Sequence, residues 1–339
     1  MKTFTALALL TVLVGAVGAR EAGRPDDRNV YGLPDINTAA GSFGPIQWSA
    51  AGKIQVFPSN VPSIAWFVAV GQSHIVNVSV PPLTTYYFPT NGAKCINLSP
   101  YNGNYYIASD PVIGATIQVN GADLGWLSRL CDQLISGTGG AGGKYGTSGV
   151  GLITVGIGGS SVCEWAPVSS AAPCPAGSTL GRTNLRLQIA AQWLTTLGIT
   201  PRAWLYQQGQ ADCVGGISLA TYASNLRAVI SYERGLAAAR ANDQWIISQD
   251  TYNQTSGTFG NGVHGGASPP FTCPDTIAQA ATNVGGDTHN FVGPNMDAIP
   301  GGGVANTYTD GAHYTSVTGN IWAAQQWSSS IINTCGSAC

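Results

Sequence analysis

The sequence predicts an α/β fold built around a parallel sheet. Two observations indicate it: short, continuous apolar runs recur along the chain, and segments with helical periodicity separate them. Continuous apolar runs are typical of parallel strands that are covered on both faces. Strands that alternate with helices favour right-handed crossovers within a single sheet.

Four apolar runs are the expected strands of this sheet. They are residues 64–70, 150–157, 203–206 and 245–247. Short segments of small or polar residues follow the first three runs. Ligands of open parallel sheets bind beyond the carboxyl ends of the strands, so we expect a functional site among the residues that follow the runs.

Helical periodicity predicts four helices, three between the strands and one after them. They cover residues 124–135, 183–197, 218–234 and 320–332. The second carries its apolar residues on one stripe, which comprises Leu185, Ile189, Trp193, Leu194 and Leu197. Gly198 and Pro201 follow, and both residue types are common just after the last turn of a helix.

The N-terminus predicts export of the protein. Residues 1–19 combine Lys2, an apolar run and a small-residue end at Ala19, as in a secretory signal peptide. The run is shorter than the ~20 apolar residues that a membrane span needs. Residues 20–62 are expected to form an irregular extension, and residues 63–339 the main domain. We therefore expect a secreted, extracellular protein, or a periplasmic one in a bacterium.

Composition narrows the function classes. Only 9% of the residues are charged and the net charge is −2, so no basic surface is expected to bind nucleic acid. Eight cysteines behind an export signal predict up to four disulfides whose pairing stays open, although Cys163 and Cys174 would close a short loop. The cysteine spacings do not match a structural zinc site, and no metal or other cofactor is expected.

Ser73, His313 and Asp310 form the predicted catalytic set. Ser73 follows the first predicted strand, and a serine hydroxyl is a weak nucleophile until a base removes its proton. His313 is the candidate base, because a neutral imidazole accepts a proton near neutral pH. Asp310, three residues earlier, can hold the tautomer of this imidazole.

An acyl-transfer site also requires hydrogen-bond donors for the oxyanion of its tetrahedral intermediate. The backbone N–H groups of Ser73 and Gly159 are the candidates, because each residue lies just past a predicted strand. The side-chain amide of Gln208, after the third strand, is the candidate for a third donor, with Gln207 and Gln210 as alternatives.

Other side chains compete for a place in the site. His74, His264 and His289 are the alternative bases. His74 adjoins Ser73, but neighbouring side chains on an extended segment point apart. His264 and His289 are expected in loops beside the pocket. Trp165 is the tryptophan that we expect near a sugar substrate, with a structural role as the alternative.

Together the polar segments resemble the sequence blocks of the SGNH hydrolase superfamily. The blocks are GQS at 71–73, GGSS at 158–161 with Trp165, QGQAD at 208–212 and DGAH at 310–313. Over about residues 63–327 they look most like the sialate O-acetylesterase-like branch, which is akin to carbohydrate esterase family six. The resemblance implies a three-layer, flavodoxin-like α/β/α fold, a Ser–His–Asp catalytic set and deacetylation of sugars without a metal.

Two positions depart from that branch. His74 stands where the branch has Asn, and Gln210 stands where it has Glu, whereas Asp212 is retained. These changes remove a carboxylate near the expected pocket and add an imidazole beside the nucleophile. His74, Trp165, Gln210 and Asp212 are therefore the candidate substrate-binding residues.

The resulting hypothesis is a secreted carbohydrate O-acetylesterase that acts through an acyl-enzyme on Ser73. Its partner would be an acetylated glycan or another small ester. One alternative is a lipase, thioesterase or polyester esterase on the same scaffold. Another is a glycan-binding protein without catalytic activity.

Overall fold

The computed structural model of the chain describes residues 53–75, 87–115, 125–137, 143–170, 173–250, 287–297, 313–314 and 317–335. The predicted signal peptide and most of the predicted extension lie outside the described residues. So do Asp310 and His264. None of the described helices is both long and apolar enough for a membrane crossing.

The described residues form an eight-stranded sheet in the order β1-β4-β3-β5-β2-β6-β7-β8. The strands are β1 (Gln55–Val56), β2 (Ala65–Gly71), β3 (Cys95–Leu98), β4 (Tyr105–Ile107), β5 (Val150–Thr154), β6 (Ala203–Gln207), β7 (Trp245–Gln249) and β8 (Asn290–Asn295). All neighbours from β3 to β8 pair in parallel, whereas β4 and β1 add an antiparallel edge. The predicted α/β fold is confirmed, and the antiparallel edge is an addition to it.

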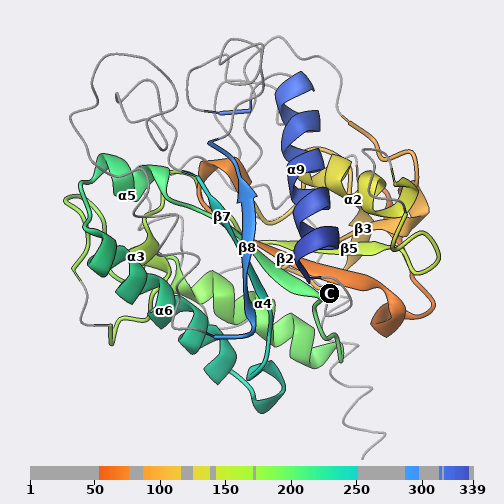
Figure 1. Cartoon of the computed structure of the whole chain (residues 1–339). Helices are drawn as coiled ribbons and strands as arrows, with labels where there is room; N and C mark the ends of the chain where they lie inside the picture. The colour runs from red at the N-terminus through yellow and green to blue at the C-terminus, as the bar shows by residue number, and fades with distance from the viewer. Residues whose placement is uncertain are drawn as a thin grey trace, which may run out of the picture. The chain divides into compact units, whose positions relative to one another are not determined.

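Helices cover both faces of this sheet. They are α2 (Leu127–Ser136), α3 (Val162–Trp165), α4 (Asn184–Thr196), α5 (Gln210–Val214), α6 (Leu219–Gly235) and α9 (Val317–Cys335). Four short 3₁₀ segments accompany them: η2 (Val61–Ser63), η3 (Ser73–Ile75), η4 (Gly92–Lys94) and η5 (Ala238–Arg240). In Figure 1, α2 and α9 lie on one side of the sheet, and α4 and α6 lie on the other.

Alternation along each strand divides the core into two layers. Phe67 faces the helices α2 and α9, where it packs in one cluster with Leu130 and Trp327. Its neighbour Trp66 faces α4 and α6, in a second cluster that includes Leu187. Successive side chains of a strand point to opposite faces, so a continuous apolar run fills both layers.

Helix α4 buries a different face from the predicted one. Leu185, Ile189 and Trp193 of the predicted stripe are only partly buried, whereas Leu187 and Leu194 are fully buried. Ala190 and Ala191 lie on the same buried face. The large apolar residues predicted the wrong stripe because the helix packs closely against the sheet through small alanines.

The predicted irregular extension contains ordered structure at its end. Gln55 and Val56 form strand β1, which pairs with β4. Lys53 is also anchored there, because its Nζ donates to the carbonyl oxygen of Ser109 at 2.8 Å. This corrects the predicted lack of regular structure for the described part of residues 20–62.

Two disulfides join described cysteines. Cys163–Cys174 is the short loop closure that the spacing predicts. Cys95–Cys131 joins the start of β3 to helix α2. Cys213 is disulfide-bonded as well.

The strands β2 and β6 approach each other most closely at Gly71. A Cβ at this position would lie 2.0 Å from the carbonyl oxygen of Gln207, and the φ of Gly71 is +147°. Only glycine avoids both the steric clash and the backbone strain. Gly71 thus sets the separation of the two strands just before Ser73.

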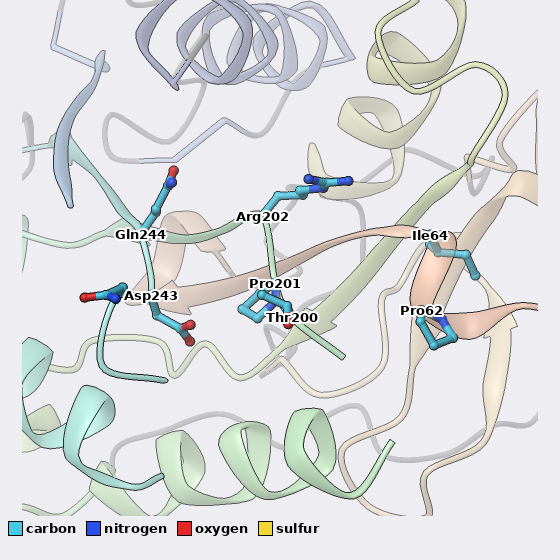
Figure 2. Close-up of a pocket in the computed structure, with 8 residues that line it drawn as sticks. Pro62, Ile64, Thr200, Pro201, Arg202, Asp243 and Gln244 are labelled. Carbon is cyan, nitrogen blue, oxygen red and sulfur yellow. The ribbon is translucent and has the colours of Figure 1, made fainter. Parts of the chain in front are cut away.

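A hollow of about 250 Å³ lies at the opposite, amino edge of the sheet. Figure 2 shows its lining residues, which belong to the segments that lead into β2, β6 and β7. Pro62 precedes β2, Pro201 precedes β6, and Asp243 precedes β7. Asp243 accepts hydrogen bonds from Trp204 Nε1 at 2.9 Å and from Arg240 at 3.0 Å, so its carboxylate belongs to a buried network under this edge.

Candidate active site

A cavity of about 730 Å³ lies at the carboxyl edge of the sheet. Segments that are far apart in the sequence line it. Ser73 follows β2, Gly159 follows β5, α5 contributes Gln210, and His313 precedes α9. Residues 175–178 complete the wall. The cavity is therefore at the edge where an open parallel sheet is expected to bind ligands.

Ser73 begins the 3₁₀ turn η3 directly after the end of β2. The backbone N–H of Gln72 donates to the carbonyl of Gln207 at 3.1 Å, and the N–H of Ile75 closes the turn on the carbonyl of Gln72 at 3.0 Å. Only 8% of Ser73 is exposed, and its side chain lines the cavity. The turn thus fixes the hydroxyl at the cavity floor.

His313 lines the same cavity, and its neighbour Tyr314 is tied to the core. The Tyr314 hydroxyl accepts a hydrogen bond from Gln207 Nε2 at 2.9 Å. Asn320 Nδ2 of α9 donates to the carbonyl of Tyr314 at 2.5 Å. Two of the three predicted catalytic residues, Ser73 and His313, therefore share a cavity, and the role of Asp310 stays a prediction.

Gly159 lines the same cavity as Ser73 and His313 through its backbone. Its φ of +70° lies in the left-handed region, where glycine carries no steric penalty. In the part of the chain that the structure describes, the backbone N–H groups of Ser73 and Gly159 donate no hydrogen bond. Both residues line the cavity, so two backbone donors are available to a ligand there.

Gln208 does not fit its predicted place as an oxyanion donor. The residue is fully buried and does not line the cavity. Its Nε2 already donates to Gln72 Oε1 at 3.1 Å, to the Ser160 carbonyl at 3.2 Å and to a carboxylate oxygen of Asp212. The amide therefore holds loops together beneath the cavity.

Asp212, like Gln208, is buried beneath the cavity and bonded to other parts of the protein, so it has a structural role. This differs from its predicted contact with substrate. It is completely buried, and its carboxylate also accepts the backbone N–H of Val162 at 2.9 Å. Burial raises the pKa of Asp212 to about 7, with hydrogen bonds from Val162 and Gln208 acting in the opposite direction. Asp212 thus ties α5 to the start of α3.

Gln210, one of the two alternatives to Gln208, does line the cavity. Its Oε1 accepts a hydrogen bond from Gln72 Nε2 at 2.8 Å and lies 3.4 Å from the Ser73 hydroxyl oxygen. The other alternative, Gln207, is fully buried and bonded to Tyr314. Gln210 is therefore the amide side chain beside the predicted nucleophile.

His74 lies beneath the cavity instead of in it. Its Nδ1 is 2.7 Å from Oδ2 of Asp250, which follows β7. Its ring stacks on Tyr314 at a centroid distance of 4.2 Å and meets His313 edge-on at 5.6 Å. This arrangement agrees with the prediction that the side chains of Ser73 and His74 diverge. It does not agree with the prediction that His74 contacts substrate directly.

Trp165 and His289 also lie away from the cavity, although one was expected near a sugar substrate and the other in a loop beside the pocket. Trp165 is completely buried, and its Nε1 donates to the Ser160 hydroxyl at 2.9 Å, so it is a core residue. His289 precedes β8 and therefore lies at the amino edge of the sheet, away from the cavity. Its Nδ1 is 3.2 Å from Asp287, which in turn pairs with Arg234.

Glu164 anchors one wall of the cavity and was not predicted. This buried carboxylate pairs with Arg182, which lines the cavity, and accepts the backbone N–H of Thr179 at 3.2 Å. The Cys163–Cys174 disulfide joins the same wall to α3. Both anchors hold the segment 175–182 in place next to the β5 loop.

The sequence analysis also missed Asp250. It lies three residues after the fourth predicted strand and directly after β7, so the rule that drew attention to the ends of the other strands applies to it equally. Gln72 stood in the recognised block but had no assigned role. Among the described residues, no group of three or more metal-ligating side chains gathers at this or any other site.

Comparisons with known proteins support the fold. No protein-family model matches the chain, and no curated protein matches it. The chain is similar to the crystal structure of the Arabidopsis thaliana protein AT4G34215, with a TM-score of 0.50 and 13% identity over 80% of this chain and 100% of that chain. It is also similar to a candidate GDSL-like lipase from Parabacteroides merdae, with a TM-score of 0.44 and 15% identity over 80% and 97% of the two chains. At such identities the first likeness shows the α/β fold alone, and the second carries no argument.

Proposed function

We propose that the cavity at the carboxyl edge is the active site of a serine ester hydrolase of the SGNH type. One observation carries the proposal: Ser73 and His313, which lie far apart in the sequence, line the same cavity together with Gly159. The sequence blocks that resemble SGNH hydrolases and the α/β fold support it as well.

In the proposed reaction, His313 removes the Ser73 proton as the oxygen attacks the ester carbonyl carbon. The imidazolium then donates that proton to the leaving alcohol when the ester C–O bond breaks, which leaves an acyl group on Ser73. Water then attacks the acyl carbon while His313 takes its proton. The bond from the acyl carbon to the Ser73 oxygen breaks, the acid leaves, and the imidazolium returns the proton to Ser73. Asp310 is the proposed partner that orients His313, as the acid does in other triads.

The oxyanion of the intermediate is proposed to bind the backbone N–H groups of Ser73 and Gly159. Both residues line the cavity, and neither N–H has another acceptor among the described residues. Backbone donors that are already in position do not need to reorganise during the reaction, and each is worth about 10²–10³ in rate.

The proposed substrate is an O-acetyl ester of a carbohydrate. The resemblance to the acetylesterase-like branch supports the acetyl group, and the size of the cavity, about 730 Å³, leaves room for a sugar beside it. We also propose that the protein is exported. The disulfides Cys95–Cys131 and Cys163–Cys174 support this, because such bonds persist in oxidising compartments.

A fluorophosphonate probe tests the proposed nucleophile. An activated serine displaces fluoride and gains one phosphonyl group, so the intact mass should rise by a single adduct that maps to Ser73. Ser178 lines the same cavity and provides the matched control. The Ser178→Ala variant should still be labelled and the Ser73→Ala variant should not. Labelling that persists in Ser73→Ala would contradict the assignment.

Ester hydrolysis tests the substrate class. Turnover should be highest with acetyl esters of an aryl alcohol and should fall as the acyl chain lengthens, and acetylated glycans should release acetate. Activity that rises with chain length would instead favour the lipase, thioesterase or polyester esterase alternative. Glycan binding without hydrolysis, and without labelling of Ser73, would favour the binding protein.

A further inference from the structure

A chain of hydrogen bonds under the cavity determines the orientation of each of its side-chain amides. It begins at Gln72, whose Oε1 accepts the backbone N–H groups of Gly209 at 3.3 Å and Ala211 at 3.1 Å. Backbone N–H groups can only donate, so the atom that they meet must be the Gln72 oxygen. The Gln72 nitrogen therefore points the other way.

Gln210 is oriented in turn by Gln72. The Gln72 Nε2 donates at 2.8 Å to the side chain of Gln210, so the atom that it meets must be Oε1 of Gln210. The amide nitrogen of Gln210 is left facing Nε2 of His74 at 3.5 Å. Two N–H groups cannot bond to each other, so Nε2 of His74 must carry a lone pair.

The other ring nitrogen of His74 agrees with this assignment. Its Nδ1 lies 2.7 Å from a carboxylate oxygen of Asp250, which requires a proton on Nδ1. Asp250 is fully buried, and 2% of His74 and 2% of Gln210 are exposed, so little water reaches these groups. Both ends of the chain thus specify one neutral tautomer of His74.

That tautomer affects two groups of the proposed active site. The Oε1 of Gln210 that it orients lies 3.4 Å from the Ser73 hydroxyl oxygen. The His74 ring meets His313 edge-on at 5.6 Å and stacks on Tyr314 at 4.2 Å. A positive charge on His74 would oppose the imidazolium that His313 must become when it accepts a proton.

We propose that His74 is a positioning residue, held as the neutral Nδ1–H tautomer by Asp250 and the Gln72–Gln210 amides. In this state it accepts the N–H of Gln210, so that together with Gln72 it holds the Gln210 carbonyl toward Ser73, and it packs against His313 without adding a charge. Its effect on turnover rests on the proposed function, whereas its tautomer does not.

The tautomer is tested by nitrogen-15 NMR of the imidazole rings at about pH 8, well above the ordinary histidine pKa of ~6.5. The His74→Gln variant identifies the His74 signals by their loss. We expect a protonated Nδ1 and an unprotonated Nε2. A protonated Nε2 would overturn the proposal, whether or not the protein is an esterase.

A charge substitution tests the amide chain. Gln210→Glu replaces the N–H donor that faces His74 by an acceptor, so Nε2 should gain a proton and the pKa of His74 should rise by about one unit or more. Gln188→Glu makes the same change on α4, which the hydrogen-bond chain does not reach, and should leave this pKa unchanged. An unchanged His74 pKa in Gln210→Glu would contradict the proposal.

Kinetics test the positioning role once hydrolysis is established. Asp250→Asn should lower kcat on the order of tenfold to a hundredfold, as the loss of other orienting groups does, with KM nearly constant. In the double variant His74→Asn/Gln210→Glu, the side chain at position 74 supplies the N–H donor and the side chain at position 210 supplies the acceptor, which reverses the roles of the wild-type pair. The double variant should recover part of the turnover that Gln210→Glu alone loses. If the double variant recovered no turnover and Asp250→Asn left kcat unchanged, His74 and Asp250 would have only a structural role.

Discussion

The two edges of the sheet carry polar groups of different kinds. At the amino edge, the buried ion pair of Arg240 and Asp243 lies beside the buried carboxyl group of Glu233, under a hollow of about 250 Å³. At the carboxyl edge, a hydroxyl and an imidazole, those of Ser73 and His313, line a cavity of about 730 Å³. The charges of the amino edge bond to one another and to the indoles of β6 and β7.

This difference between the two edges shows that a cluster of buried charged groups does not by itself indicate where the proposed active site lies. The amino-edge carboxylates accept hydrogen bonds from the core beside them, so their role is to hold strands and helix α6 together. Apart from Arg182, the side chains that line the carboxyl-edge cavity carry no permanent charge, and their proposed reactivity depends on their arrangement. The comparison predicts that substitutions at the carboxyl edge change turnover, and that those at the amino edge change stability.

The largest expected effect is on turnover at the carboxyl edge. Ser73→Ala and His313→Gln should each lower kcat by at least about 10³-fold, because each removes a group that takes part in proton transfer. Ser63→Ala and His289→Gln are the matched substitutions at the amino edge, and they should keep nearly full activity. The kcat of all four variants is measured by hydrolysis of an aryl acetate. Equal losses of kcat at both edges would contradict the assignment of turnover to the carboxyl edge.

A smaller effect is expected at Gly159, where φ is +70°. Gly159→Ala should lower the free energy of unfolding by about 1–2 kcal/mol through backbone strain and lower kcat about 10²-fold through displacement of its N–H group. Gly198→Ala is the matched control, because φ is +64° there and a Cβ meets nothing within 4 Å. It should show the loss of stability alone, by urea denaturation and the same hydrolysis assay. Equal kinetic losses in both would argue against a role for Gly159 in the reaction.

The two disulfides sharpen the comparison further. Cys163–Cys174 joins the cavity wall to α3, whereas Cys95–Cys131 joins the start of β3 to α2. Replacing each pair by serine should lower the free energy of unfolding by about 2–4 kcal/mol, and more for Cys95–Cys131, which closes the longer loop. Only the loss of Cys163–Cys174 should raise KM severalfold, since it releases the wall. A KM increase in both variants would show that the wall depends on the whole sheet.

The smallest effect concerns the pH dependence of stability at the amino edge. Burial and, to a lesser extent, the neighbouring Asp243 carboxylate raise the pKa of Glu233 from 4.5 to about 9. Between these values the folded state holds a proton that the unfolded state releases. The free energy of unfolding therefore falls as pH rises from about 4.5 through 9.

Glu233→Gln should remove this dependence. Urea denaturation at about pH 6 and about pH 9 should show a decrease for the wild type, on the order of 1–3 kcal/mol, that the variant lacks. Ester hydrolysis by the variant at neutral pH should match that of the wild type. A steeper pH dependence in the variant would show that Glu233 is ionised in the folded protein.

The strands that the sequence predicts correctly are those buried on both faces. Strands β2, β5, β6 and β7 fill two core layers, so apolar residues predominate in them. The missed strands lack that signal for physical reasons. Asn97 interrupts β3, where its side chain accepts the backbone N–H of Ile113 at 2.6 Å. Strand β8 contains Gly293 and Pro294 and lies at the edge of the described sheet, where hydrophobic burial imposes less of a pattern.

The site was predictable in outline because strand ends converge. Ser73, Gly159 and His313 do line one cavity. Which side chain reaches the cavity was not predictable, since Gln208 and Gln210 differ by two positions and are both buried, yet only Gln210 lines the cavity. The pairing of His74 with Asp250 depends on how far the ends of β2, β6 and β7 are staggered, which hydrophobic patterning does not encode.

Gly71 has a consequence for anyone who wishes to redesign this protein. The backbones of β2 and β6 approach each other there without room for even a methyl group, so the turn that begins at Ser73 cannot shift independently of the end of β6, which leads into helix α5 and Gln210. Attempts to alter the ligand that the cavity binds should leave Gly71 unchanged. Variation should be directed to Ala176 and Ser178, which line the cavity, whereas Gly177 between them should be kept because its φ of +85° would strain any other residue.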